Sequence, residues 1–251
     1  MFSKIKIIYV NEISSTQDKV IEYLRNDYYS SLLLVASTQT KGRGRKQDDW
    51  FSPKGGFWAT LGLKTTLSLN KSQLALFHYF TATLIRRVIE LEYDLFVQIK
   101  WPNDLIYRNK KLAGILIDYV VSAQYNYILI GMGVNLNNSR NEMPENLREI
   151  AISIKDILQK TVSIENFAQR ICNYAKVYYS PITEYNETEL DKLIQEYNQN
   201  SQIFEKDVII NDLGKFQCKG INNEGLMQFI GRRFNLNLPI DDLQRIKRII
   251  S

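Results

Sequence analysis

The sequence predicts an α+β fold, in which a mixed, mainly antiparallel sheet with flanking helices is followed by a small C-terminal β-barrel. Strand-like runs of apolar residues are separated by two long segments whose apolar residues recur at helical spacing. Residues 111–121 and 125–136 face each other across a short polar turn, which indicates an antiparallel hairpin. Beyond about residue 200, short strand-like runs are separated by turns containing Asp, Asn and Gly.

Strands are predicted where apolar residues alternate or run together, and helices where they recur three and four residues apart. In the first half these are strand 1–10, a helix after the capping residues 14–18, strand 32–36, a polar loop 39–55, strand 57–63 and helix 72–92. In the second half they are strands 96–101, 111–121 and 125–136, a helical region 153–199, and strands 208–210, 216–221 and 226–229.

Length and composition agree with this organisation. The chain has 251 residues, 45% of them hydrophobic and 12% aromatic, which suits one large domain with a small second one. The pattern changes near residues 200–203, so we expect one domain over residues 1–200 and another over 201–251.

Charge and rare residues limit the possible functions. A formal charge of +5 is compatible with anionic partners such as nucleotides or nucleic acid. The two cysteines, Cys172 and Cys218, lack metal-type spacing, and the one histidine, His78, lies in an apolar helical run; both facts argue against a zinc site. The alternating N-terminus is unlike a signal peptide, and no apolar run reaches the length of a membrane span, so we expect a cytoplasmic protein.

The most informative segment is the polar loop at residues 39–46, which carries four Lys or Arg residues and two glycines. Glycine lets the backbone approach a ligand closely, and the cations favour a phosphate or carboxylate that would order the loop. The same pattern is compatible with an exposed basic turn or a nucleic-acid contact.

Three further segments each allow a functional and a structural interpretation. Lys100 ends a strand just before Pro102, where its ammonium could face a cleft, or where the chain simply turns. Gly131 and Gly133 alternate on one strand, which leaves a groove for a flat ligand or a site of tight packing. Residues 14–17 begin a helix, where free N–H groups suit polar ligand atoms or an ordinary cap.

The order of these segments resembles the biotin–protein ligase family. The matching runs are Ser15-Thr16-Gln17, Gly42-Arg43-Gly44-Arg45, Lys100-Trp101-Pro102-Asn103-Asp104-Leu105, Lys111-Leu112-Ala113-Gly114-Ile115-Leu116 and Gly131-Met132-Gly133-Val134-Asn135. The resemblance covers about residues 5–140, while the C-terminal barrel agrees in size and position. Because the ligand-binding pattern starts by Ser14, we expect the form without an N-terminal DNA-binding domain and without a repressor role.

The resemblance implies a catalytic domain like that of class II aminoacyl-tRNA synthetases over residues 1–200, and a two-step reaction. Biotin and ATP form biotinyl-5′-adenylate, and a lysine of a biotin carboxyl carrier protein then takes the biotin. It also implies Mg²⁺ on the phosphates, held largely by phosphate oxygens and water. A homodimer is compatible with the resemblance, whereas no DNA or membrane partner is expected.

The resemblance also implies roles for individual residues. The catalytic residues would be Lys100, which is the first choice for an essential residue, together with Arg43 and Arg45. The biotin-binding residues would be Ser15, Thr16, Gln17, Gln39, Gly42, Arg43, Gly44, Arg45, Lys100, Gly114 and Gly131. The ATP-binding residues would be Arg43, Arg45, Trp50, Asn103, Asp104, Lys111, Gly133 and Asn135. No residue is assigned to a metal.

One departure from the family pattern affects the loop. Asp48 and Asp49 follow the arginines where the family commonly has cations, which predicts weaker loop closure or ATP affinity, or a homologue that binds biotin without turnover. The alternatives to a biotin ligase are a lipoate–protein ligase and a basic nucleic-acid-binding protein. The lipoate enzyme would have a histidine near its glycine motif, and neither glycine motif has one here.

Overall fold

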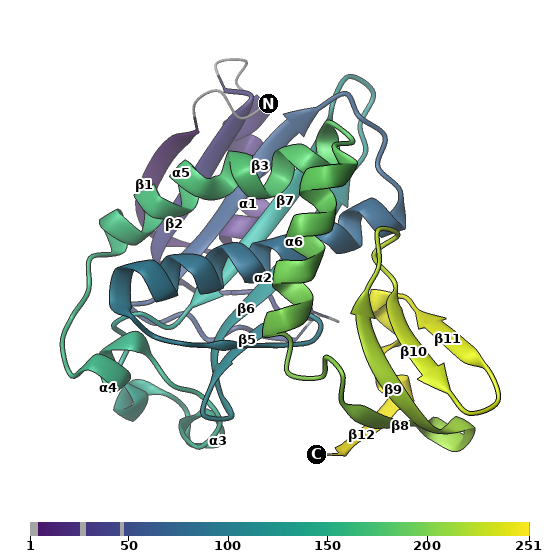
Figure 1. The fold of residues 1–251 in the computed structure, drawn as a ribbon. Coiled ribbons are helices and arrows are strands. Elements are labelled where there is room, and N and C mark those ends of the chain that lie inside the picture. The colour runs from purple at the N-terminus through teal and green to yellow at the C-terminus, as the bar shows by residue number, and fades with distance from the viewer. Residues whose placement is uncertain (1–4, 26–28, 46–47, 251) are drawn as a thin grey trace.

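The computed structural model describes residues 5–25, 29–45 and 48–250, and within them it contains two sheets (Figure 1). The larger sheet has the strand order β1-β2-β3-β7-β6-β5-β4, with β1 and β2 parallel and every other neighbouring pair antiparallel. Its strands are β1 (Lys6–Ile13), β2 (Ser31–Gln39), β3 (Phe57–Thr65), β4 (Gln98–Lys100), β5 (Asp104–Tyr107), β6 (Lys110–Val120) and β7 (Asn126–Val134). This confirms the predicted mixed, mainly antiparallel sheet.

Helices cover both faces of this sheet (Figure 1). They are α1 (Thr16–Arg25), α2 (Lys71–Tyr93), α3 (Glu145–Arg148), α4 (Ile154–Leu158), α5 (Ile164–Thr183) and α6 (Glu187–Asn200). Because side chains alternate along a strand, Phe57, Ala59 and Leu61 of β3 face the core under α2 and α5. Thr60 and Gly62 face the opposite side, where α1 packs. None of the helices in the described ranges is long and apolar enough to cross a membrane.

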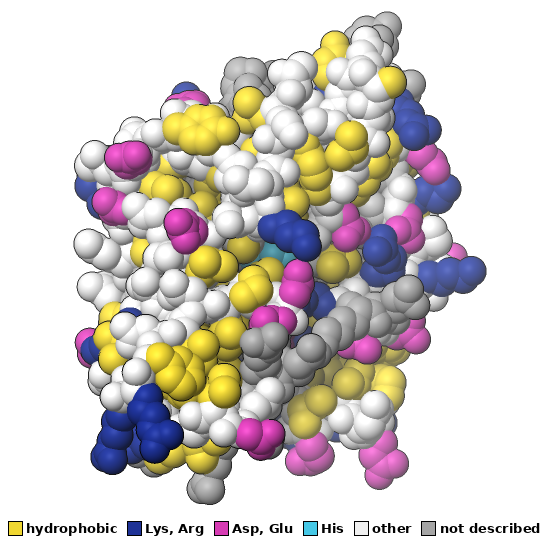
Figure 2. Space-filling view, turned by 90° about the vertical axis from the view of Figure 1, so that its right-hand side faces the viewer, with side chains coloured by type: hydrophobic (Ala, Val, Ile, Leu, Met, Phe, Trp, Pro, Cys, Tyr) yellow, Lys and Arg dark blue, Asp and Glu magenta, His cyan; other side chains and the backbone are white. Residues whose placement is uncertain are grey.

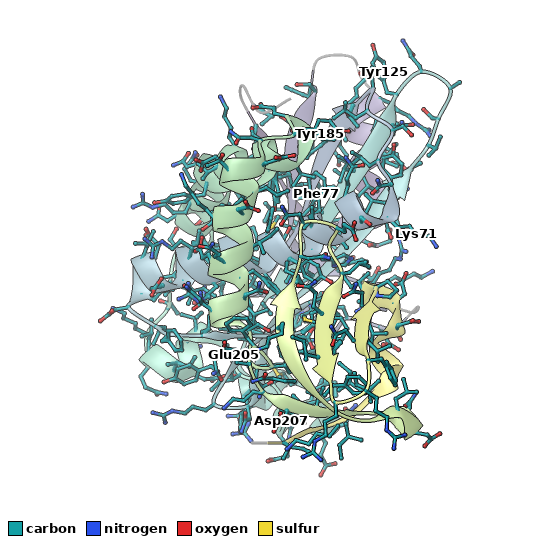
Figure 3. The ribbon with its side chains drawn as sticks, turned by 45° about the vertical axis from the view of Figure 1, so that its right-hand side comes forward. Lys71, Phe77, Tyr125, Tyr185, Glu205 and Asp207 are labelled. Atoms are coloured by element: carbon teal, nitrogen blue, oxygen red, sulfur yellow. The ribbon has the colours of Figure 1, made fainter. Side chains whose placement is uncertain are left out.

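The second sheet follows α6 and is antiparallel, in the order β11-β10-β9-β8-β12. Its strands are β8 (Asp207–Ile210), β9 (Gly214–Ile221), β10 (Met227–Gly231), β11 (Asn235–Leu238) and β12 (Ile246–Ile250). Figure 3 shows it beginning beside Glu205 and Asp207 and lying along α6. Asn198 of α6 donates to Ile221 O and accepts from Ile221 N. We propose that residues from 201 onward form the small second domain, docked firmly by such contacts.

The structure differs from the sequence prediction mainly at hairpins and short elements. Residues 96–101 contain only the three-residue β4, and the chain turns at Trp101–Asn103 into β5. The strand β5 was not predicted, because Asn103 and Asp104 are residues typical of turns. The short 3₁₀ segment Arg140–Glu142, α3, β11 and β12 were also missed, because elements of three to five residues have too few apolar repeats to show a period. Residues 1–4 of the first predicted strand lie outside the described residues.

His78 of α2 should make stability depend on pH. Its side chain is 9% exposed, and burial, with a smaller contribution from the charge of Arg45, lowers its pKa from 6.5 to about 3. Between these values the unfolded chain binds a proton that the folded chain does not, so the free energy of unfolding should fall as pH drops from 6.5 toward 3. The slope from this group is at most about 1.4 kcal/mol per pH unit. Urea unfolding of the wild type and His78→Gln at pH 7 and pH 5 measures it.

The difference between the wild type and His78→Gln reports on His78 alone, because the carboxylates contribute equally to the pH dependence of both proteins. The variant should lose less stability between the two pH values than the wild type. An equal loss of unfolding free energy in the two proteins would show that His78 binds its proton as readily in the folded state as in the unfolded state.

Candidate functional site

A cavity of about 410 Å³ lies on the α1 face of the larger sheet. Its floor is formed by β3, β6 and β7, its roof by the loop after β2, and one wall by the segment 143–151. Lining residues from the sequence prediction are Ser15, Thr16, Gln17, Gln39, Arg43, Gly44, Arg45, Trp50, Asn103, Asp104, Lys111, Gly114, Gly131, Gly133 and Asn135. The four segments that were separate in the sequence therefore meet in one place.

One end of the cavity is polar and buried. Thr16, the first residue of α1, has its N–H 2.7 Å and its hydroxyl 3.0 Å from Gln39 Oε1. The same hydroxyl is 2.9 Å from that of Thr60, which donates to Gln17 Oε1 at 3.0 Å. The neighbouring Ser15 Oγ is buried and has no hydrogen-bond partner among the described residues. Such an unpaired hydroxyl in a cavity wall is available to a polar ligand atom.

The glycines of the floor make room for side chains of the protein itself. Gly114 and Gly133 are direct partners across β6 and β7, and a Cβ on either would lie within 2.7 Å of the Trp50 ring. A Cβ on Gly131 would lie 2.6 Å from Gln17 Oε1. Of the two interpretations of Gly131 and Gly133, the structure favours tight packing, because side chains of the protein lie directly against them. The indole of Trp50 covers the Gly114–Gly133 pair, so a flat ligand must lie against Trp50 or displace it.

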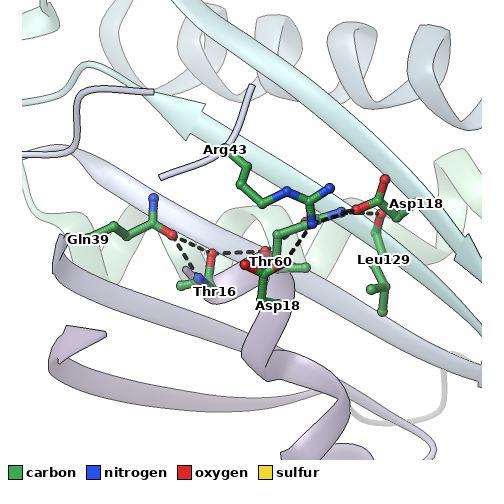
Figure 4. A network of polar contacts seen from close by, with 8 residues as sticks. Thr16, Asp18, Gln39, Arg43, Thr60, Asp118 and Leu129 are labelled. Carbon is green, nitrogen blue, oxygen red and sulfur yellow. Dashed lines mark hydrogen bonds and ion pairs between the residues drawn. The ribbon is translucent and has the colours of Figure 1, made fainter. Parts of the chain in front are cut away.

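The arginines of the roof loop are paired with residues far away in the sequence. Arg43 Nη1 lies 2.6 Å from Asp18 Oδ1 and 3.3 Å from Asp118 Oδ2 (Figure 4). Burial lowers the pKa of Arg43, but its hydrogen bond to Asp18 and the charge of Asp118 outweigh this, so the net shift is upward. The positive charge of Arg43 is thus offset by two carboxylates of the protein itself.

Arg45 lies at the other end of the cavity. Its Nη1 donates to Asn103 Oδ1 at 3.3 Å, and its Nη2 donates to Ile240 O at 3.4 Å and lies 3.8 Å from Asp241 Oδ1. This guanidinium therefore joins the roof loop, the β4–β5 turn and the second sheet's region. Its remaining N–H groups can still receive an anion in the cavity.

Lys111, the second residue of β6, supplies an ammonium to the same end of the cavity. Its Nζ lies 2.8 Å from Asp104 Oδ1 and 4.8 Å from the ring centroid of Trp50. Its backbone pairs with the cavity wall, because its N–H donates to Ile150 O and its carbonyl accepts from Ile152 N. Two cations, Arg45 and Lys111, therefore converge on the space beside Asn103 and Trp50.

Two predicted site residues are not among those that line the cavity. Lys100 is exposed at the end of β4, where the alternation that buries Ile99 turns its neighbours to solvent, and its essential role stays a prediction. Gly42 lies behind the roof, where a Cβ would be 2.3 Å from Trp50 O. Its role is to allow the close return of the loop.

Sequence reasoning missed the apolar side of the cavity. Asp48, Asp49 and the polar Thr60 also line the cavity, and the missed apolar residues are Phe51, Ala59, Ile115, Leu116, Met132, Met143, Leu147, Ile150 and Ala151. The last four belong to the wall around α3, which had no strong sequence period. Only its apolar spacing, Met143, Leu147, Ile150 and Ala151, could have indicated a surface facing the ligand.

The acidic residues of the cavity do not form a dense metal site. Among the described residues there is no group of three or more His, Cys, Asp or Glu side chains that could hold a metal ion. The lining carboxylates are those of Asp48, Asp49 and Asp104, and Asp104 is paired with Lys111. This donor set fits a Mg²⁺ ion that keeps water and phosphate oxygens as most of its ligands.

Comparison with known proteins agrees with this geometry. Residues 9–135 match the profile of the biotin/lipoate A/B protein ligase family. The chain is 29% identical over 224 residues to the bifunctional ligase/repressor BirA of Bacillus subtilis, covering 88% of this chain and 68% of that protein. It is 31% identical over 141 residues to human biotin–protein ligase, covering 53% of this chain and 19% of that protein.

Solved structures of similar fold include a biotin protein ligase from Aquifex aeolicus in complex with biotin and ATP. It has a TM-score of 0.73 at 22% identity, covering 93% of this chain and 95% of that one. A biotin protein ligase from Leishmania major in complex with biotinyl-5-AMP has a TM-score of 0.60 at 22% identity, covering 93% and 98%. Both likenesses extend over the second sheet as well as the first, which supports the predicted fold class.

Proposed function

Because the chain belongs to the biotin/lipoate A/B protein ligase family, we propose that it is a biotin–protein ligase. In this proposal a biotin carboxylate oxygen attacks the α-phosphorus of ATP, and the bond to pyrophosphate breaks. The amine of an acceptor lysine then attacks the carbonyl of the resulting biotinyl-5′-adenylate, and AMP leaves. The proposal draws on the similarity to a human protein named as a biotin–protein ligase and on the two chemically different ends of the cavity.

The observation that carries the choice of biotin is the hydrogen-bond polarity of the buried end. Gln17 Oε1 and Gln39 Oε1 can only accept, so the hydroxyl hydrogens of Thr16 and Thr60 are used within the network. Thr16 can then offer a ligand only an acceptor, whereas the unpaired Ser15 hydroxyl can donate. A donor beside an acceptor matches the C=O and N–H of biotin's cyclic urea. The dithiolane ring of lipoate has neither group.

The opposite end suits the reacting anions. Lys111 and Arg45 would neutralise the carboxylate and the α-phosphate as they approach, which is the main barrier when two anions must meet. We therefore propose Lys111 for the role expected of Lys100, whose own part in the reaction stays a prediction. The apolar wall formed by Met143, Leu147 and Ile150, together with Trp50, is suited to the adenine ring.

We further propose Mg²⁺ as the metal, bound mainly through ATP, with Asp48 and Asp49 as the nearest candidate carboxylates for its water shell. When bound, the ion would screen the charge of the phosphates. The acceptor would be a biotin carboxyl carrier protein or domain, and the chain would work in the cytoplasm, in agreement with its unpaired cysteines Cys172 and Cys218. We also propose that two copies of the chain form a homodimer.

The nucleic-acid alternative receives less support. On the face drawn in Figure 2, Lys and Arg side chains are interspersed with Asp and Glu, without one continuous basic surface. The arginines that suggested a phosphate contact are partly neutralised by Asp18, Asp118 and Asp241. A groove that tracks a nucleic-acid backbone would need cations exposed in a row.

The test is pyrophosphate release from Mg-ATP in the presence of biotin or lipoate. We expect release with biotin, at least about a hundredfold faster than with lipoate, because a site built for hydrogen bonds rejects an analogue without them. Faster release with lipoate would favour the lipoate ligase. No release with either, despite binding of biotin, would identify a homologue without turnover.

A further inference from the structure

Asp118 of β6 lies beside the buried end of the cavity but is not among its lining residues. Its Oδ2 atom accepts from Gln17 Nε2 at 3.1 Å and lies 3.3 Å from Arg43 Nη1. Figure 4 shows Asp118 at one end of the network, beside Arg43 and Leu129, with Thr60 in the middle and Thr16 and Gln39 at the other end. One carboxylate therefore contacts both the roof of the cavity and the support of its floor.

The contact with Gln17 fixes which way its amide points. Asp118 Oδ2 and Leu129 O, which accepts from Gln17 Nε2 at 3.2 Å, both lack hydrogens, so the NH₂ group must face them. Gln17 Oε1 then faces Thr60 and accepts its hydroxyl hydrogen. Gly131 leaves the space that this orientation needs, because a Cβ there would lie 2.6 Å from Oε1.

The contact with Arg43 holds the roof loop. Arg43 pairs with both α1, through Asp18 at 2.6 Å, and β6, through Asp118 at 3.3 Å. When the loop is closed, the guanidinium of Arg43 neutralises one of the two negative charges of Asp18 and Asp118. When the loop is open, the two carboxylates repel each other without this cation between them. Closure is therefore favoured electrostatically at the end of the cavity where Ser15 and Thr16 lie.

We infer that Asp118 is a positioning residue that couples closure of the roof loop to the orientation of the groups that recognise the ligand's head. This inference rests on the proposed function for the identity of the ligand. Asp118 acts through Gln17 and Arg43 and touches no substrate itself. Its two contacts can be separated by substitution, because an amide keeps an oxygen for Gln17 but loses the charge that attracts Arg43.

Three variants and a control test the inference. Asp118→Asn keeps the acceptor and removes the charge, Asp118→Ala removes both, and Asp18→Asn weakens only the hold on Arg43. Glu22→Gln removes an exposed carboxylate that pairs with Lys19 on the same helix and serves as control. For each variant, the KM values for biotin and ATP are measured by pyrophosphate release. The rate of tryptic cleavage after Lys41, Arg43 and Arg45 is measured without ligand.

We expect cleavage at least about threefold faster in all three test variants and unchanged in Glu22→Gln, since a weakened ion pair opens the loop more often. The KM for biotin should rise about tenfold in Asp118→Ala, through the lost and partly buried hydrogen bond to Gln17, and less than about threefold in the two asparagine variants. The KM for ATP should change less than about twofold in every case, because Asp118 lies at the other end of the cavity.

Wild-type cleavage rates in Asp118→Asn would overturn the coupling to the loop. Equal rises in the KM values for biotin and ATP in Asp118→Ala would overturn the orienting role and indicate general damage to the site. If the wild type releases no pyrophosphate, the proposed function fails instead. The cleavage rates still decide in that case whether Asp118 holds the roof loop, because they need no substrate.

Discussion

Replacing Lys111 with alanine is expected to lower the rate of biotinyl-adenylate formation by at least about a hundredfold, the loss typical of a preorganised group that stabilises developing charge. Its Nζ lies between Asp104 and Trp50. Its backbone N–H and carbonyl both form hydrogen bonds with the cavity wall, to Ile150 and Ile152. The ammonium therefore has little freedom to lose when the two anions meet. Single-turnover measurement of pyrophosphate release, with both substrates saturating, gives the rate directly.

Lys100→Ala is the matched control for Lys111→Ala. It removes the same charge from a nearby strand of the same sheet, but from an exposed position that does not line the cavity. We expect its rate to be at least about tenfold higher than that of Lys111→Ala, since an exposed charge is screened by solvent. The reverse order would return the essential role to Lys100. Lys111→Arg should recover only part of the activity, because a guanidinium is larger and differently shaped.

Gly133→Ala is expected to raise the KM for ATP at least about tenfold. The added Cβ would lie 2.6 Å from the Trp50 ring, which cannot bend and must move as a whole. Trp50 also lies under Lys111, so its displacement disturbs both the adenine wall and the ammonium. A shift of about 1.4 kcal/mol in the free energy of binding corresponds to the tenfold change. Steady-state kinetics at varied ATP and saturating biotin measures the effect.

Gly62→Ala on β3 provides the control for Gly133→Ala. Its Cβ would also be too close to neighbours, at 2.6 Å from Leu24 and 2.7 Å from Val20, but these form the small core under α1 and do not line the cavity. The control should lower the melting temperature and leave the KM for ATP within about twofold, because overpacking a core costs stability. A similar rise in KM for the two variants would mean that Trp50 has no specific part in binding the nucleotide.

The sequence allowed prediction of the sheet, the long helices and most of the cavity, because the relevant signals are local. The hairpin of β6 and β7 has strand periodicity and a polar turn, and the helix at 72–92 has a clear apolar stripe with a capping box at Asn70. Gly42–Arg45 and Gly131–Gly133 were assigned to the cavity from short runs, and most of these residues line it.

The rest depended on contacts between residues that are distant in the chain. Which lysine enters the cavity was decided by how β4 and β6 sit in the sheet, so Lys100 could not be distinguished from Lys111 by its motif alone. The carboxylates that neutralise Arg43 come from α1 and β6, and no spacing in the sequence predicts that they lie together. The polarity of the Thr16 network likewise exists only once Gln17, Gln39 and Thr60 are brought together.

The backbone pairing of Lys111 with the segment around Ala151 has a mechanical consequence. The lysine's main chain is hydrogen-bonded to Ile150 and Ile152, so the apolar wall suited to the base and the ammonium suited to the phosphate are joined by a backbone pairing. A displacement of the wall that admits or releases a nucleotide must carry the positive charge with it. Binding of the base and placement of the Lys111 ammonium are thus expected to occur together. A nucleotide that is not fully bound would leave this ammonium away from the reacting atoms.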